Sequence, residues 1–290
     1  MLYYYAHTGH KIGLERARRG MTVMKKLTAH GIDMRMLVND FRAGVAMKEE
    51  QGLREYVTIE TIQDIDAIAQ MGDSAIIDSN EDDHGRLVKY VSDFKHVWRF
   101  AHDAEDKSVH GEILFRPECN DKACEEACEE AVIIDDHYFG THKKEERILL
   151  FLRDHDHQKT LLNNDDFFNA FDMELLLGHY FFVKYEDDLA KRFSTLHEPE
   201  EYMDVISESS TVVTASAQAA LEARVSGAKV VFLKLEGETP LYPLDILEKH
   251  GVKVVSGLDI EAVKSALAEA TSEKPTGLKP FDESDLLKNL

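Results

Sequence analysis

The chain has 290 residues, which is enough for about two domains of roughly 150 residues each. Hydrophobic residues make up 43% of the composition, so the chain can bury a core and is not disordered throughout. The formal charge of −21 disfavours nucleic-acid and membrane-surface binding, because an acidic surface repels phosphate groups. No apolar run approaches the roughly 20 residues that span a bilayer, and no signal-peptide pattern occurs, so we expect a cytoplasmic protein without membrane insertion.

Three cysteines lie close together, at Cys119, Cys124 and Cys128. An odd number of cysteines in one cluster does not make a disulfide framework, and this spacing matches no paired zinc motif. Free thiols in a reducing compartment are the simplest expectation. The surrounding Glu-rich stretch, 120–130, is expected to form a surface helix.

Strand and helix patterns alternate along the first half of the chain. The apolar run 2–6 predicts a strand, and apolar residues at three- and four-residue spacing between Leu14 and Leu27 predict a helix that ends near Gly31. Further strands are predicted at 34–38, 74–78, 96–100 and 112–115, and further helices at 62–71 and 86–94.

The polar stretch 141–146 is the predicted domain boundary, which divides the chain into 1–143 and 144–290. After it the alternation of strands and helices starts again. Strands are predicted at 147–152, 180–184, 211–214, 229–234 and 252–255, and helices at 167–177, 200–208, 216–225, 242–250 and 260–270. The tail from residue 271 is expected to be loose or to pack back over the domain junction.

Strands separated by helices predict parallel sheets with helices on both faces. Two such halves predict an α/β fold of two doubly wound, Rossmann-like domains with a cleft between them. Ligands of such sheets bind beyond the carboxyl ends of the strands. Residues that directly follow strands are therefore the first candidates for function.

Gly9 and His10 follow the first predicted strand. A glycine there permits a tight turn, the next helix offers free N–H groups to an anion, and a histidine can transfer a proton near neutral pH. The alternative is an ordinary strand-to-helix loop with a solvated histidine. Asp78 ends another predicted strand, where its carboxylate could bind hydroxyl groups or orient a histidine, or simply cap a helix.

A third candidate is the segment from Thr214 through Ala215 and Ser216 to Glu222. Its small residues leave a helix N-terminus open for phosphate, and Glu222 lies about two turns further on, within reach of a ribose hydroxyl. The alternative is an Ala-rich helix with a solvent-facing glutamate. His155 and His157 alternate with aspartates, but no third ligand can be assigned, so no metal site is predicted. We also expect no cofactor.

Together, Gly9-His10, Ile76-Ile77-Asp78 and the block TASAQAALEARVSGAKVVFLK resemble the two-domain GT-B enzymes that act on nucleotide sugars. The closest resemblance is to the UDP-sugar hydrolases of pseudaminic acid biosynthesis. It implies that His10 falls on the histidine of the G-x-G-H-x-x-R loop, the proposed catalytic residue of that family. It also implies that Thr214, Ala215, Ser216 and Glu222 hold the nucleotide, and that the ligand is a UDP-type nucleotide sugar.

The chain departs from that family at several glycines. His7 replaces the first glycine of the loop, Gly13 replaces its arginine, and the segment LRDHD at 152–156 replaces a glycine-rich loop. Three functions therefore stay open. The first is a nucleotide-sugar hydrolase of surface-glycan (nonulosonic-acid-type) biosynthesis, with His10 as general acid or base and Asp78 beside it. The others are a GT-B glycosyltransferase and a non-catalytic nucleotide-sugar-binding or scaffold protein. The oligomeric state is not predicted.

Overall fold

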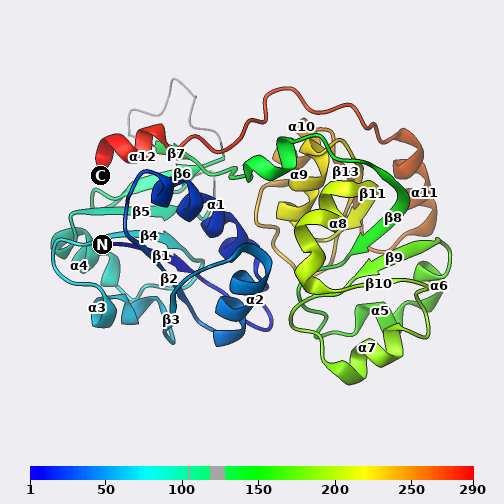
Figure 1. The fold of residues 1–290 in the computed structure, drawn as a ribbon, viewed down its shortest axis with the longest axis horizontal. Coiled ribbons are helices and arrows are strands. Elements are labelled where there is room, and N and C mark those ends of the chain that lie inside the picture. Colours follow the sequence, from blue (N-terminus) through cyan, green and yellow to red (C-terminus); the bar gives the residue numbers. More distant parts are fainter. Residues whose placement is uncertain (104, 118–127) are drawn as a thin grey trace. The chain divides into compact units, whose positions relative to one another are not determined.

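The structure, a computed structural model, describes residues 1–103, 105–117 and 128–290. The chain forms two compact units (Figure 1): Met1–Ile133 together with Phe281–Leu290, and Ile134–Pro280. The division therefore comes before the polar stretch 141–146, and the last ten residues belong with the first unit. Segment 134–140 belongs to the second unit, where, for example, Ser226 Oγ donates a hydrogen bond of 3.1 Å to the Tyr138 carbonyl.

Seven parallel strands form the sheet of the first unit, in the order β3-β2-β1-β4-β5-β6-β7. The strands are Leu2–Ala6 (β1), Met34–Val38 (β2), Tyr56–Thr58 (β3), Ser74–Asp78 (β4), His96–Phe100 (β5), Ile113–Arg116 (β6) and Cys128–Glu130 (β7). The helices are Glu15–Ala29 (α1), Phe41–Gln51 (α2), Ile62–Asp64 (η1), Ile65–Ile68 (α3), Arg86–Asp93 (α4) and Ser284–Asn289 (α12). All residues of the central strands β1 and β4 are buried, as expected for strands covered on both faces.

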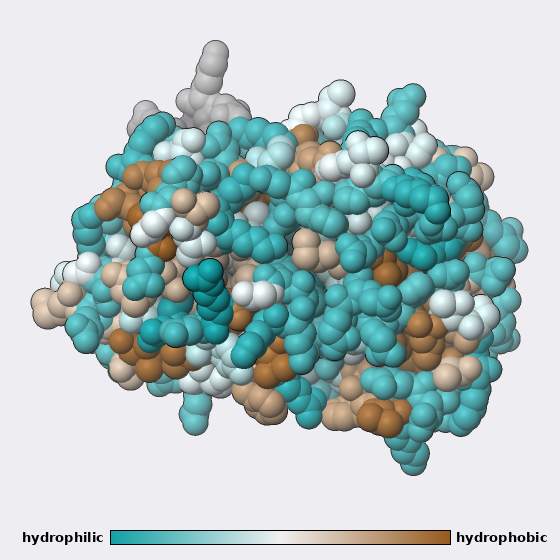
Figure 2. All heavy atoms as spheres, viewed as in Figure 1, coloured by the Kyte–Doolittle hydropathy of each residue, from teal (hydrophilic) through white to brown (hydrophobic). Residues whose placement is uncertain are grey.

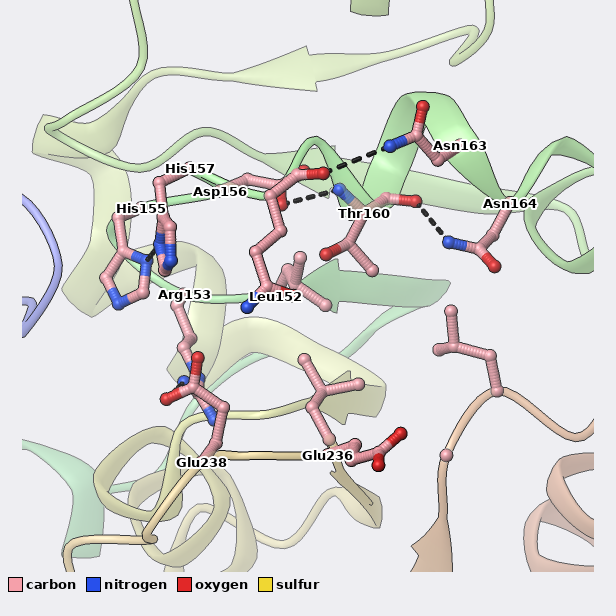
Figure 3. A pocket seen from close by; sticks show the side chains of 14 residues that line it. Leu152, Arg153, His155, Asp156, His157, Thr160, Asn163, Asn164, Glu236 and Glu238 are labelled. Carbon is pink, nitrogen blue, oxygen red and sulfur yellow. Dashed lines mark hydrogen bonds and ion pairs between the residues drawn. The ribbon is translucent and has the colours of Figure 1, made fainter.

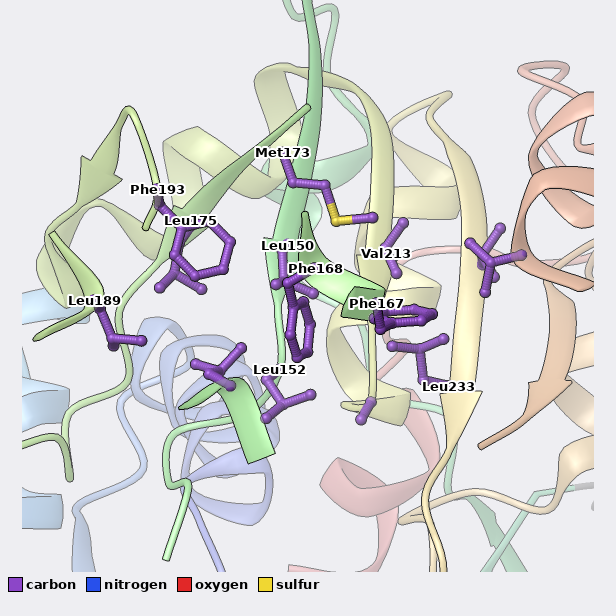
Figure 4. Packing of buried hydrophobic residues seen from close by; sticks show 14 of the residues in the cluster. Leu150, Leu152, Phe167, Phe168, Met173, Leu175, Leu189, Phe193, Val213 and Leu233 are labelled. Carbon is purple, nitrogen blue, oxygen red and sulfur yellow. The ribbon is translucent and has the colours of Figure 1, made fainter. Parts of the chain in front are cut away.

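Six parallel strands form the sheet of the second unit, in the order β10-β9-β8-β11-β12-β13. The strands are Glu145–Phe151 (β8), Met173–Leu176 (β9), Leu196–His197 (β10), Ser209–Thr214 (β11), Lys229–Lys234 (β12) and Lys253–Ser256 (β13). The helices are Asp136–Phe139 (η2), Thr160–Asn163 (α5), Asp165–Phe168 (α6), Val183–Leu189 (α7), Pro199–Glu201 (η3), Tyr202–Glu208 (α8), Ala217–Val225 (α9), Leu244–Lys249 (α10) and Ile260–Glu269 (α11). Side chains from β8, β9, β11 and β12 pack with Phe167, Phe168 and Phe193 into one core cluster (Figure 4).

The expected architecture of two doubly wound parallel sheets is confirmed, with the bounds of five strands (β1, β2, β4, β5 and β12) as predicted. Helix α2 and strands β3 and β10 are not among the predicted elements, and three predicted elements outside the acidic stretch differ. Within 167–177 the chain forms β9 rather than one helix, because a short buried strand shows the same continuous apolar run as a buried helix. The strand predicted at 180–184 is wrong, since α7 begins at Val183. The helix predicted at 62–71 is reduced to η1 and α3.

The acidic segment also differs where it is described. Cys128 lies on β7 rather than on a helix, and it is disulfide-bonded rather than a free thiol. Cys119 and Cys124 lie outside the described residues. Figure 2 shows mainly hydrophilic residues on the face in view. In the part of the chain that the structure describes, no helix is long and apolar enough to cross a bilayer.

Glu129 on β7 is a buried carboxylate with a strongly altered proton affinity. Burial, together with the negative charge of Asp285 on α12, raises its pKa from 4.5 to about 7. The native state therefore holds this proton more tightly than the unfolded state does. The resulting stabilisation is fully present below about pH 4.5 and is lost as the pH rises through 7.

We expect Glu129→Gln to remove this pH dependence. The pKa change corresponds to about 3 kcal/mol, so at pH 8 the variant should unfold with a free energy about 2–3 kcal/mol higher than the parent. Near pH 4 the two proteins should be equally stable. Urea unfolding followed by the fluorescence of Trp98, the only tryptophan, measures both values in the first unit. Glu49→Gln, at an exposed position of the same unit, is the control. Equal stability of parent and Glu129→Gln at pH 8 would contradict this expectation.

Candidate functional site

The order of strands in each sheet fixes where a ligand is expected. In the first unit β1 pairs with β2 on one side and with β4 on the other. In the second unit β8 holds the same place between β9 and β11. The chain leaves β1 and β4 in opposite directions, and it leaves β8 and β11 in opposite directions too. This opens a crevice beyond the carboxyl ends of each of these two pairs of strands. The candidate residues Gly9, His10 and Asp78 lie at the first of these points, and Thr214, Ala215 and Ser216 at the second.

The loop after β1 is a closed turn. The carbonyl oxygen of Gly9 accepts hydrogen bonds of 2.9 Å from the backbone N–H groups of both Ile12 and Gly13. Gly13 has a φ of +86°, which explains a glycine at the position where the related motif carries an arginine. His10 is half-buried within this turn, five residues before α1 begins at Glu15. Its role in proton transfer stays a prediction.

Asp78 is fully buried and binds several donors of its own unit. Its Oδ2 accepts a hydrogen bond of 2.8 Å from the Tyr4 hydroxyl, and Arg19 binds both carboxylate oxygens. Arg16 Nε lies 3.4 Å from Oδ1. The carboxylate thus ties β4 to β1 and α1. It is an internal ion-pair centre rather than a helix cap, and the catalytic role predicted for it stays a prediction.

His7 is a second histidine at this edge and is not among the site residues predicted from the sequence. Its Nδ1 lies 2.7 Å from the side-chain oxygen of Asn80, so Nδ1 carries the proton and donates it. Its Nε2 lies 3.9 Å from a carboxylate oxygen of Glu81. Both partners follow β4 directly, as His7 follows β1. The rule that ligands gather beyond strand ends would have singled out this residue too.

The loop after β8 packs closely against the backbone of two other segments of the second unit. The backbone N–H of Ala215 donates to the Leu152 carbonyl (3.2 Å), and that of Tyr180 to the Asp154 carbonyl (2.9 Å). A Cβ on Gly178 would lie 2.5 Å from the Arg153 carbonyl oxygen, so only glycine fits there. The segment that replaces a glycine-rich loop therefore relies on a glycine elsewhere in the chain.

Thr214, Ala215 and Ser216 are buried at the start of α9. Ser216 caps this helix, because its hydroxyl accepts a hydrogen bond of 3.1 Å from the backbone N–H of Ala219. The Thr214 hydroxyl accepts one of 2.9 Å from the Ser216 N–H. The three residues thus form the predicted helix N-terminus, but it is buried, and the N–H groups of Ser216 and Ala219 are bonded within the chain rather than left open.

Glu222 faces the interior of the second unit, so the alternative of a solvent-facing residue is wrong. Its carboxylate accepts hydrogen bonds from the Tyr202 hydroxyl (2.7 Å) and from the Gln218 amide (2.8 Å), and Gln218 accepts one from Tyr242 (2.7 Å). This network joins α8, α9 and the segment before α10. These hydrogen bonds fix the position of α9 within the interior of the second unit.

A pocket of about 510 Å³ opens at the carboxyl edge of the second sheet (Figure 3). It lies beyond β8, β12 and β13. Its walls are formed by Leu152, Arg153, His155, Asp156, His157, Gln158, Thr160, Asn163, Asn164, Leu235, Glu236, Glu238, Gly257 and Leu258. None of the residues predicted from the sequence to hold the nucleotide lines it, but Arg153 connects the two regions, since its Nε donates a hydrogen bond of 3.2 Å to the Ala215 carbonyl.

Two histidines stand together in the pocket wall. Nδ1 of His155 and Nδ1 of His157 are 3.2 Å apart, so one donates a proton to the other. Burial, with the charge of Arg153 as a second cause, lowers the pKa of His155 to about 4, so His155 is neutral at pH 7. Asp156 binds the backbone N–H groups of Thr160 (2.7 Å) and Leu161 (2.9 Å), so its carboxylate caps α5.

No protein-family description and no curated protein matches the chain. Solved structures do match. A putative UDP-N-acetylglucosamine 2-epimerase from Listeria monocytogenes is 12% identical, with a TM-score of 0.59 over 95% of this chain and 92% of that one. The UDP complex of S. aureus MnaA is 13% identical, with a TM-score of 0.58 over the same shares. UDP-GlcNAc 2-epimerase from Methanocaldococcus jannaschii, solved with UDP-GlcNAc and UDP, is 12% identical, with a TM-score of 0.56 over 97% and 96%. These likenesses establish the GT-B fold.

Proposed function

We propose that this protein binds a nucleoside diphosphate sugar in its second unit and hydrolyses the linkage between sugar and diphosphate. The observation that carries the proposal is the pocket of about 510 Å³ beyond β8, β12 and β13, which is large enough for a small-molecule ligand. It lies at the edge of the sheet where ligands of doubly wound folds bind. The similar structures from S. aureus and M. jannaschii hold UDP, which supports a nucleotide as the ligand class.

Three groups in the second unit suit the parts of such a ligand. The Arg153 guanidinium suits the diphosphate, because it offers N–H donors and a positive charge. The N-terminus of α9, from Ser216, contributes the positive end of its helix dipole, since the N–H groups of Ser216 and Ala219 are already bonded. The ribose hydroxyls need an acceptor. Glu222 could serve only by giving up two buried hydrogen bonds, so we assign this role to the exposed carboxylate of Glu236 in the pocket wall.

The chemical step assigned to His10 is proton transfer. A water oxygen attacks the anomeric carbon, and the bond from that carbon to the diphosphate oxygen breaks. As general base, His10 takes a proton from the water, and the diphosphate leaves with the bonding electron pair. A glycosyltransferase would differ only in using an acceptor hydroxyl in place of water. We also propose that the protein acts in the cytoplasm.

Nucleotide binding is tested by calorimetry and thermal unfolding with UDP, CDP and GDP. A ligand at 100 times its Kd should stabilise the second unit by about 2.7 kcal/mol. Glu236→Ala should weaken UDP binding roughly fivefold to tenfold, because it removes hydrogen bonds to the ribose. Glu248→Ala, an exposed glutamate outside the pocket, should leave it unchanged. No stabilisation by any of the three nucleotides would overturn the proposed function and leave a scaffold protein.

The products then decide between hydrolysis and transfer. A hydrolase releases free sugar and nucleotide in buffer alone. A glycosyltransferase consumes the nucleotide sugar at a comparable rate only when an acceptor is added. Consumption that depends on an added acceptor would replace the hydrolase assignment by the transferase.

A further inference from the structure

Arg153 is the one lysine or arginine among the fourteen residues that line the pocket. Burial keeps His155 neutral at pH 7, so this histidine of the wall adds no positive charge. The acidic side chains of the wall are Asp156, Glu236 and Glu238. An anionic ligand therefore has a single permanent cation to bind in this pocket.

That cation is already paired. Arg153 Nη1 lies 2.5 Å from Oε2 of Glu238, and the two side chains are only 13% and 24% exposed. Figure 3 shows the Glu238 carboxylate against the guanidinium, below the two imidazole rings. A carboxylate binds a guanidinium through the same kind of N–H···O contacts as a phosphate does. Glu238 thus occupies the position on Arg153 that a phosphate of a ligand would take.

We infer that the Arg153–Glu238 ion pair is an internal plug that a diphosphate displaces on binding. Arg153 keeps its orientation in the exchange, because its Nε also donates to the Ala215 carbonyl at the start of α9. Glu238 is released into a pocket that also holds Glu236, where it can accept hydrogen bonds from ligand hydroxyls. The pocket therefore selects ligands that carry a diphosphate and neighbouring hydroxyls together, and it disfavours simple anions.

This inference rests on the proposed nucleotide site and specifies how that site chooses its ligand. The plug lowers the affinity of the pocket for anions, because the ion pair must break before a phosphate reaches Arg153. Removing the charge of Glu238 should therefore tighten the binding of anions, whereas in an ordinary structural ion pair it should only lower stability. Glu238→Gln keeps the shape of the side chain and tests this difference.

The experiment is calorimetric titration of the full-length protein at pH 7.5 with UDP, uridine and inorganic pyrophosphate. Glu238→Gln should bind pyrophosphate roughly three- to tenfold more tightly than the parent, as expected for loss of a partly buried ion pair. Uridine binding should be unchanged. Glu236→Gln, which removes a pocket charge not paired with Arg153, should change pyrophosphate binding less than twofold and separates the plug from a general charge effect. Arg153→Gln should weaken the binding of UDP and pyrophosphate at least tenfold, with folding checked by thermal unfolding.

The outcomes separate the two claims. If UDP binds and Glu238→Gln leaves the affinity for UDP and pyrophosphate unchanged, the plug is wrong and the nucleotide site stands. If Glu238→Gln tightens pyrophosphate binding while UDP binds no better than pyrophosphate, the plug stands and nucleotide recognition fails. Equal gains in Glu238→Gln and Glu236→Gln would also overturn the plug, because they would show a general charge effect.

Discussion

Turnover of a nucleotide sugar is expected to fall about 100-fold or more when His10 is replaced by alanine, while the protein folds normally. The size follows from the usual contribution of a general acid or base. His10 lies in the turn closed by Gly9 and Gly13, which is held by backbone hydrogen bonds that the substitution leaves intact. Steady-state assays should show the loss in kcat rather than in KM, since the step affected is proton transfer.

Two further variants make this experiment specific. His30→Ala changes a histidine at the C-terminal end of α1, away from the carboxyl edge of the sheet, and should leave turnover unchanged. His7→Ala changes the other imidazole at that edge, which is held by Asn80. If His7→Ala loses the activity and His10→Ala retains it, the proton transfer belongs to His7, and the assignment to His10 is wrong.

The largest loss of stability is expected for Asp78→Ala. The substitution leaves Arg16, Arg19 and the Tyr4 hydroxyl without their shared partner, and Arg19 is only 3% exposed. Breaking a buried ion pair by removing one member costs about 3–5 kcal/mol. Urea unfolding monitored by Trp98 reports this value for the unit that contains Asp78. Asp82→Ala, whose carboxylate is 74% exposed, is the matched control. A loss below about 1 kcal/mol in Asp78→Ala would show that this ion-pair centre does not hold α1 against the sheet.

Much of the fold could be predicted from the sequence, because the central strands are short apolar runs and polar loops bound them on both sides. Strand β1, for example, ends where a Thr-Gly-His turn begins. The misassigned segment 167–177 shows the limit of this reasoning. Its residues Met173–Leu176 are good helix formers, yet they form a strand because β8 offers a pairing edge. The pairing of β9 with β8 cannot be predicted from the local pattern of residues.

The sequence predicts where the candidate residues lie in the fold, while their roles in binding and catalysis stay predictions. Gly9, His10 and Ser216 follow strands at the two points where the strand order reverses, and the alternation of strands and helices predicts this. The partners of Asp78 and Glu222 could not be predicted in the same way. Arg19 lies 59 residues from Asp78, and Tyr202 reaches Glu222 from another helix. The ion pair between Arg153 and Glu238 likewise joins two loops that only the folded sheet brings together.

The return of residues 281–290 to the first unit has a consequence for the order in which the protein can be completed. Leu286 on α12 is fully buried there, and Glu283 binds His30 at 3.0 Å. A nascent chain leaving the ribosome presents residues 134–280 in full before this last segment emerges. The second unit, although later in the chain, is therefore the first to have all of its residues available for folding, and the first unit must wait until residues 281–290 have emerged to complete its own.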